Sequence, residues 1–210
     1  MVIKIFSLIC LSIGIFILVQ IIMPLIAFKF WEFSNYWQSK ALIDPQKGEV
    51  AGVSIQNIGN FPAFISDSKE RSYTYDRFFL TINKINLKDI LVKVDTNSFE
   101  ENLAHLPGSA LPGEKGNIFI TGHSSLVQLY KPGNFQAIFA KLPELKIGDN
   151  IELYVSGQKF EYVTLQIKIV DPKDISVINP PDKVGRYLTL MTCVPPGFNT
   201  KRLVVLAKLK

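Results

Sequence analysis

The longest apolar stretch of the chain lies near its start. Residues 5–28 contain no charged side chain across 24 positions, and a lysine stands at each end. About 20 apolar residues are needed for a helix to cross the hydrocarbon core of a bilayer. A cleaved secretory signal has a shorter apolar core followed by small residues, whereas Phe28, Phe30 and Trp31 occur here. The pattern therefore predicts a single transmembrane helix that is retained as an anchor.

The pattern changes twice after this stretch. Residues 31–75 are mixed and polar without a sustained period, which predicts a stalk with at most short local structure. From Asp76 onward, short apolar runs alternate with turn residues and predict strands at 78–82, 90–94, 117–121, 150–155, 160–170, 187–192 and 202–209. Seven or eight such strands are typical of a closed β-barrel or a sandwich. One helical interruption is predicted at 135–142, where apolar residues recur at helical spacing.

Alternation along three of these runs separates two faces. One face carries aliphatic rows, which comprise Ile118, Ile120, Leu188, Leu190, Leu203, Val205, Ala207 and Leu209. If these rows fill the barrel, then His123, Cys193 and Arg202 project away from the core at the ends of strands. Loops at strand ends can wall a groove, so this is a suitable place for a site.

Charge and cysteine content narrow the range of functions. The net charge is +5, but residues 31–210 carry 21 basic and 18 acidic side chains, and no basic cluster is interleaved with aromatics. Nucleic acid is therefore not expected as a partner. Cys10 lies in the apolar stretch, which leaves Cys193 as the one thiol in the remainder of the chain. Such a residue is either a buried, inert side chain or a reactive thiol.

A reactive thiol needs two helpers. The thiolate is the nucleophile, and a nearby imidazolium stabilises it and can protonate a leaving amine. The chain has two histidines, so the candidate acid is His123 or His105. Arg202, nine residues after Cys193, could donate to a developing oxyanion. Each residue also has an ordinary structural interpretation: a small buried side chain, a core histidine and an edge charge.

Two segments carry a family resemblance. The segment TLMTCVPPGFNTKRLVV resembles the sortase signature, in which a TLxTC strand leads through a loop to an arginine that opens the last strand. The segment LPGSALPGEKGNIFITGHSS is similar to the sortase stretch that contains the catalytic histidine. The resemblance covers residues 76–210. It implies an eight-stranded barrel with His123 as acid and base, Cys193 as nucleophile and Arg202 as the substrate-positioning or oxyanion donor.

The resemblance also implies further site residues. Groove-lining or nucleophile-flanking positions of the family correspond to Thr121, Thr189, Met191 and Thr192. The loop 171–186 corresponds to the substrate-recognition loop, in which Val177 and Ile178 would contact the apolar residues of a sorting signal.

Calcium is the one metal that the resemblance raises, because some sortases bind Ca²⁺ beside the recognition loop. The available carboxylates are Glu114, Asp171, Asp174 and Asp182. Scattered carboxylates are usually solvated. No metal and no required cofactor are therefore assigned.

The resulting expectation is a mostly β, membrane-anchored cysteine transpeptidase. Residues 1–30 would form a cytoplasmic stub and transmembrane anchor, 31–75 an extracytoplasmic stalk and 76–210 the catalytic β-barrel. The enzyme would cleave an LPXTG-like signal of surface proteins and transfer the acyl group to an amine of a cell-wall precursor or a pilin. The alternatives are a cysteine peptidase that uses water and a membrane-tethered β-barrel that binds peptides without catalysis.

Overall fold

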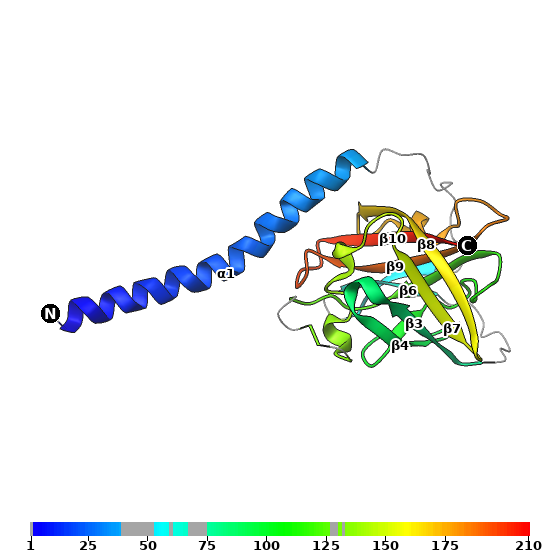
Figure 1. Ribbon diagram of the computed structural model, residues 1–210, viewed down its shortest axis with the longest axis horizontal. Helices are drawn as coiled ribbons and strands as arrows, with labels where there is room; N and C mark the ends of the chain where they lie inside the picture. The colour runs from blue at the N-terminus through cyan, green and yellow to red at the C-terminus, as the bar shows by residue number, and fades with distance from the viewer. Residues whose placement is uncertain (1, 39–52, 59–60, 67–74, 127–129, 132) are drawn as a thin grey trace. The chain divides into compact units, whose positions relative to one another are not determined.

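The computed structural model divides the chain into two compact units, residues 1–40 and 41–210. It describes residues 2–38, 53–58, 61–66, 75–126, 130–131 and 133–210. The first unit contains the helix α1 (Val2–Gln38) (Figure 1). A helix is thus present over residues 5–28, as predicted, and it continues past residue 30. Within the described part of the chain, no helix is both long enough and apolar enough to qualify as a membrane span.

The predicted stalk contains one small sheet. Strands β1 (Val53–Ile58) and β2 (Phe61–Ser66) pair in an antiparallel hairpin. Most of the other residues of the segment 31–75 lie outside the described ranges. The boundaries predicted for the stalk and for the catalytic domain therefore stay predictions.

The remaining strands form a closed barrel of eight strands in the order β10-β8-β7-β3-β4-β5-β6-β9, as predicted (Figure 1). All seven predicted runs are strands. The pairs β4–β5 and β6–β9 are parallel, and the other pairs are antiparallel. The strands are β3 (Arg77–Ile82), β4 (Leu87–Lys93), β5 (Leu103–His105), β6 (Gly116–Thr121), β7 (Asn150–Val155), β8 (Gln158–Val170), β9 (Arg186–Val194) and β10 (Lys201–Leu209).

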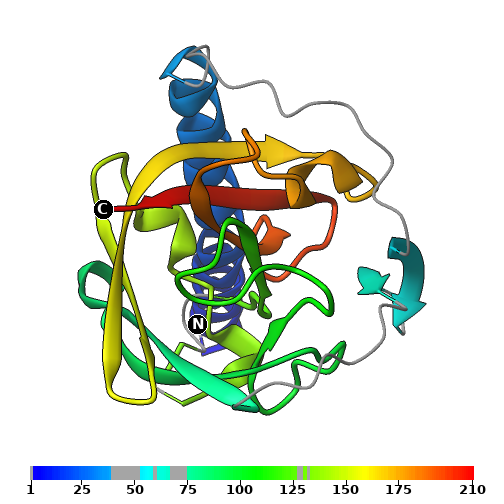
Figure 2. The same cartoon turned by 90° about the vertical axis from the view of Figure 1, so that its right-hand side faces the viewer.

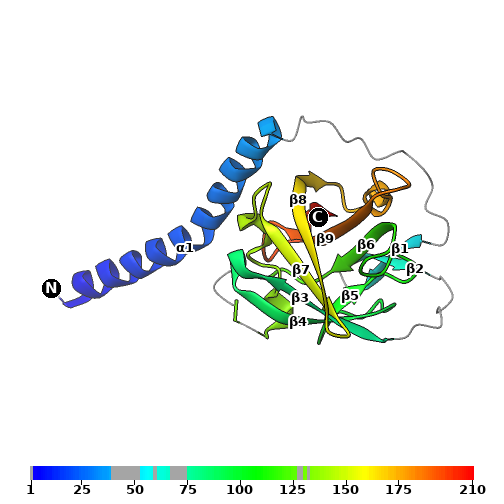
Figure 3. The same ribbon diagram turned by 45° about the vertical axis from the view of Figure 1, so that its right-hand side comes forward.

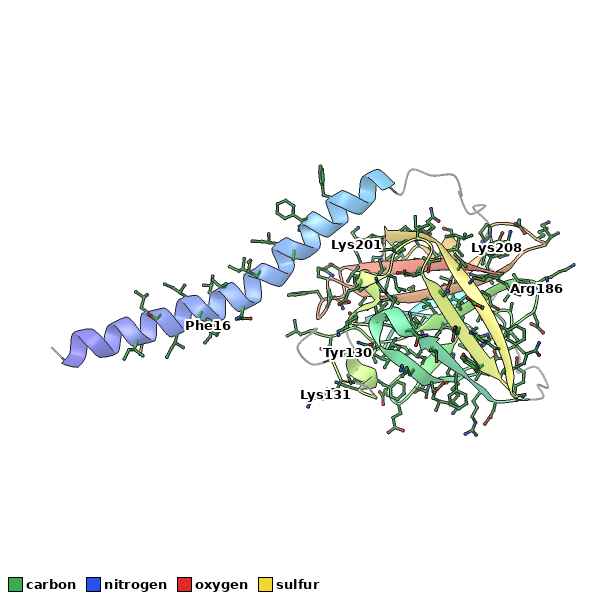
Figure 4. The ribbon with its side chains drawn as sticks, in the orientation of Figure 1. Phe16, Tyr130, Lys131, Arg186, Lys201 and Lys208 are labelled. Atoms are coloured by element: carbon green, nitrogen blue, oxygen red, sulfur yellow. The ribbon has the colours of Figure 1, made fainter. Side chains whose placement is uncertain are left out.

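The aliphatic rows fill the barrel, as the alternation predicts. Ile120, Leu190 and Val205 are aligned across β6, β9 and β10, and all three are fully buried. Burial of aliphatic side chains from neighbouring strands stabilises the sheet at about 25 cal/mol per Å² of apolar surface. Lys201 and Lys208, which Figure 4 labels, lie near opposite ends of β10, so each end of this strand carries a positive charge.

The opposite face of these strands is covered over part of its length. A second apolar cluster covers it and consists of Leu106, Phe119, Val177, Ile178, Met191 and Val204. Two of these residues belong to η5 (Ile175–Ile178), a short 3₁₀ helix between β8 and β9 (Figure 2). Asn117 ties η5 to the sheet, because its amide donates to the Ile178 carbonyl at 2.9 Å and accepts from the Thr189 hydroxyl at 2.9 Å.

The predicted helical interruption consists of 3₁₀ turns rather than an α-helix. The turns are η3 (Phe135–Ala137) and η4 (Leu142–Glu144), and a further turn, η1 (Asn83–Ile85), links β3 to β4. The backbone N–H of Phe139 donates to the carbonyl of His123 at 3.0 Å instead of to its own turn. Proline at position 143 also has no N–H to continue a helical ladder. The apolar side chains are nevertheless buried, with Phe139 and Leu142 fully inaccessible.

Candidate active site

The register of three neighbouring strands brings the predicted catalytic residues to one end of the sheet. Cys193 on β9 is directly opposite Arg202 on β10. On the other side of β9, the parallel strand β6 pairs Thr121 with Met191, and the N–H of Gly122 continues this ladder to the Met191 carbonyl at 3.3 Å. His123 follows Thr121 by two residues, as Cys193 follows Met191. Figure 3 shows β6 beside β9 in the barrel.

Gly122, which precedes His123, and Thr192, which precedes Cys193, are hydrogen-bonded to each other. The hydroxyl of Thr192 donates to the carbonyl of Gly122 at 2.8 Å, and Thr192 is buried. A side chain at position 122 would be obstructed, because an added Cβ would lie 2.5 Å from Leu103 Cδ2 and 2.9 Å from Phe139 Cδ2. Glycine at 122 thus leaves room for Leu103 and Phe139, and the Thr192 hydroxyl joins the ends of β6 and β9. This hydrogen bond gives Thr192 a role in positioning the end of the strand.

Cys193 is a free, half-buried thiol at the end of β9. Burial raises the pKa of this thiol, and the charge of Arg202 opposes that rise. The two effects have a simple origin, since a low-dielectric surrounding disfavours the thiolate and a nearby cation favours it. The positive charge of Arg202 therefore lowers the pKa of Cys193 and favours the thiolate over the thiol.

His123 is half-buried beside an aromatic ring. The ring of Phe99 lies 4.4 Å from the imidazole, centroid to centroid, at an interplanar angle of 55°. Burial lowers the pKa of His123, and the negative charge of Glu100 raises it. Near neutral pH the thiol and the imidazole are thus both biased toward their uncharged forms.

Arg202 is almost completely buried, with 2% of its surface exposed. Its Nη1 donates to the carbonyls of Asn199 at 3.0 Å and Lys201 at 3.1 Å. These bonds fix part of the guanidinium against the β9–β10 loop. A guanidinium carries five N–H donors in a planar fork, a geometry that suits an oxyanion.

The second histidine occupies a different part of the barrel. His105 is fully buried on β5, and β6 separates it from β9. Its Nδ1 lies 3.2 Å from the Asp95 carboxylate, and its Nε2 lies 2.9 Å from both the Ser109 hydroxyl and the Ala110 carbonyl. Both ring nitrogens are engaged in these contacts. Of the two candidate histidines, the topology therefore brings His123 and not His105 to Cys193.

Replacing His105 by Gln is expected to lower the free energy of unfolding by about 3 kcal/mol, because the buried ring loses its hydrogen bonds to the Asp95 N–H, the Ser109 hydroxyl and the Ala110 carbonyl. The measurement is equilibrium denaturation of residues 41–210. His123→Gln is the matched control, and we expect it to lose only about 1 kcal/mol because His123 is half-exposed. Equal losses in the two variants would contradict a structural role for His105.

The predicted substrate-binding residues have different surroundings. Thr121 is half-exposed at the end of β6, whereas Thr189 and Met191 are buried. Val177 and Ile178 are also buried, at 4% and 7% exposure, in the second apolar cluster. Phe99 and Glu100 were not predicted as site residues, because the polar run around them has no period that predicts a contact with His123.

The four candidate calcium ligands each complete a local turn. Glu114 accepts from the N–H of Leu111. Asp171 accepts from the N–H of Lys173, and Asp174 accepts from the N–H of Ser176. Asp182 accepts from the N–H of Val184 and from the Tyr187 hydroxyl. In the part of the chain that the structure describes, three or more acidic, cysteine or histidine side chains do not gather as a metal site.

The sequence and the fold are similar to those of known proteins. A family model described as the sortase domain matches residues 80–210. Sortase D of Bacillus subtilis is 32% identical over 133 residues, which cover 61% of this chain and 61% of that protein. This chain therefore spans about three fifths of the length of that curated relative.

Solved structures agree with the family model. A Sortase D5 transpeptidase of Clostridium perfringens matches with a TM-score of 0.54 at 26% identity, over 64% of this chain and 79% of that one. Sortase C of Streptococcus pneumoniae, studied for its catalysis and pilin substrate specificity, matches with a TM-score of 0.56 at 28% identity, over 66% of this chain and 70% of that one. With its eight-stranded barrel and a family match that covers more than half of its residues, the chain belongs to the sortase family.

Proposed function

We propose that this sortase is a cysteine transpeptidase that joins a sorting-signal peptide to an amine. The observation that carries the proposal is the placement of Cys193 directly opposite Arg202, with His123 two residues past the end of the neighbouring strand β6. A nucleophile, an acid–base group and a fixed cation at one strand end are the parts that acyl transfer requires. The matched Clostridium perfringens protein is a transpeptidase, which supports this reaction class.

The first half of the reaction forms a thioester. The Cys193 thiolate adds to the carbonyl carbon of the Thr–Gly bond in an LPXTG-like signal, and the electron pair moves onto the carbonyl oxygen. Arg202 donates to this oxyanion. As the tetrahedral intermediate collapses, the C–N bond breaks and His123 gives its proton to the leaving amine.

The second half releases the product. An incoming amine adds to the thioester carbonyl, and the neutral imidazole of His123 takes its proton. The C–S bond then breaks, which leaves a new amide and regenerates the Cys193 thiolate. The lowered pKa of His123 favours this half, because the imidazole must be neutral to act as a base.

The proposed substrates are surface proteins that carry a C-terminal sorting signal, and the proposed acceptor is an amine of a cell-wall precursor or a pilin. The pilin specificity of the matched Streptococcus pneumoniae protein supports the inclusion of pilins. Thr121, Thr189, Met191, Thr192, Val177 and Ile178 remain proposed substrate residues. Of these, Thr121 is the best placed for direct contact because it is half-exposed at the strand end.

The proposed location is the cell membrane, with a cytoplasmic N-terminus and an extracytoplasmic catalytic domain. The uncharged run at residues 5–28 supports a single-pass anchor. Attachment to the membrane would hold the enzyme near two substrates that are present at the same surface. Calcium and other cofactors are not part of the proposed chemistry.

The test of the proposed function is product analysis with a labelled LPXTG-like peptide, with and without triglycine as the acceptor amine. We expect a ligated product whose yield rises with the concentration of triglycine. Cleaved peptide alone at every amine concentration would instead identify a peptidase that uses water. Peptide binding without cleavage would identify a non-catalytic barrel.

A further inference from the structure

The segment between β4 and β5 contacts the proposed catalytic histidine although it belongs to neither of the sortase sequence motifs. This segment, residues 94–102, we name the β4–β5 loop. Its residue Phe99 is half-buried, and its ring lies against the His123 imidazole at 4.4 Å between centroids and 55° between planes. The contact brings an apolar side chain from a separate element onto the group that must move protons.

Hydrogen bonds within the β4–β5 loop define its conformation. The amide of Asn102 donates to the carbonyls of Ser98 and Leu103, each at 2.9 Å. The N–H of Ser98 donates to the Thr96 hydroxyl at 3.1 Å. These hydrogen bonds involve residues that precede and follow Phe99 in the sequence. They reduce the number of conformations that the loop can adopt.

The base of the same loop is attached to the buried histidine. The N–H of Thr96 donates to the His105 carbonyl at 3.1 Å, and the N–H of Asp95 donates to His105 Nδ1 at 3.3 Å. His105 in turn pairs with Ile120 on β6, the strand that leads into His123. The loop is therefore fixed to the sheet close to the element that positions the imidazole.

We propose that Phe99 is a positioning residue for His123, held by the Asp95–His105 contact at the base of the β4–β5 loop. This inference rests on the proposed function only in giving His123 the role of acid and base. The Phe99 ring limits rotation of the imidazole about its side-chain bonds and removes water from one of its faces. A positioned imidazole reaches the leaving amine in the productive orientation more often than a freely rotating one.

Two neighbouring residues of the loop have opposite electrostatic effects on the imidazole. Phe99 contributes to the burial that lowers the pKa of His123, and the exposed carboxylate of Glu100 raises that pKa. At the ends of the adjoining strands, Cys193 on β9 and Arg202 on β10 are also titratable or charged. Both remain in place when the loop residues are changed. Substitution of Phe99 and of Glu100 should therefore shift the imidazole titration in opposite directions.

The test is NMR titration of the two histidine imidazoles in full-length wild-type protein and in the variants Phe99→Ala, Phe99→Leu and Glu100→Gln. We expect Phe99→Ala to raise the pKa of His123 toward the ordinary value for histidine and Glu100→Gln to lower it. Phe99→Leu keeps apolar cover and should leave the pKa closer to that of the wild type. Phe79→Ala, which removes a partly exposed phenylalanine on β3, is the matched control and should leave the titration unchanged.

Peptide ligation is measured on the same proteins. Phe99→Ala should lower kcat by about 10- to 100-fold with a smaller change in KM, and Phe99→Leu should recover part of this loss. The circular dichroism spectrum establishes that each variant is folded. An unchanged His123 titration in folded Phe99→Ala would overturn the proposal. Because the titration needs no turnover, it tests this inference even if the wild-type protein ligates no peptide, a result that would instead reject the proposed function.

Discussion

Replacing Cys193 by Ala is expected to abolish the covalent acyl-enzyme and to lower peptide ligation by at least about 10⁴-fold. The reason is that alanine has no group able to form the thioester, and loss of a covalent nucleophile in comparable enzymes costs rates of this order. The barrel should be retained, because Cys193 is only half-buried and lies at a strand end. The measurement is mass spectrometry of the intact protein after incubation with a labelled LPXTG-like peptide.

The chain offers a matched control for this experiment. Cys10 is the other cysteine of the sequence and lies in α1, far along the chain from β9. Cys10→Ala should still give a protein whose mass increases by one acyl group. A labelled Cys193→Ala protein, or loss of labelling in Cys10→Ala alone, would show that Cys193 is not the nucleophile.

The barrel was predictable because its strands follow simple rules. Aliphatic residues that recur at every second position face a common core, and fully buried Leu188, Leu190 and Val205 satisfy this rule. Strand β5 was missed because it has only three residues, Leu103–His105, all of them buried. A run this short has no alternation to detect. Its position also depends on a parallel pairing with β4 that local sequence does not specify.

The candidate site was predictable only in part. Alternation and the strand ends predicted that Cys193 and Arg202 lie on the same side of the sheet, and the structure makes them direct cross-strand partners. The covering of that face by Val177 and Ile178 was not predicted, because it depends on how the segment between β8 and β9 folds back. Tertiary bonds decide this, such as that from Asn117 to the Ile178 carbonyl. Contacts between distant loops leave no periodic pattern in the sequence.

The protonation states of the site follow from the same geometry. Burial raises the pKa of Cys193 and lowers that of His123, so burial favours the neutral form of both groups near neutral pH. Arg202 and Glu100 act in the other direction, each toward the ion pair. Under the proposed function, Arg202 and Glu100 would therefore both favour the reactive ion pair from separate elements.

Replacing Arg202 by Gln is expected to slow acylation by about 10²- to 10³-fold, because the oxyanion loses a charged donor. The same change should shift the pH profile of Cys193 alkylation by iodoacetamide upward, since Arg202 lowers the pKa of this thiol. Arg202→Lys separates the two effects. Lysine keeps the positive charge, so the pH profile of Cys193 alkylation should stay close to that of the wild type. Lysine lacks the planar fork, so the acylation rate should still fall.

The control for the Arg202 variants is Lys201→Ala. Lys201 is the preceding residue of β10, its side chain is 48% exposed, and its amine lies 3.7 Å from the Asp171 carboxylate. An exposed pair of this kind has little effect on a buried group, because water screens it. We therefore expect Lys201→Ala to keep both the acylation rate and the alkylation profile. If Lys201→Ala shifts the alkylation profile as far as Arg202→Gln does, then the net charge of the strand end sets the pKa of Cys193. The cross-strand position of Arg202 would then have no specific effect.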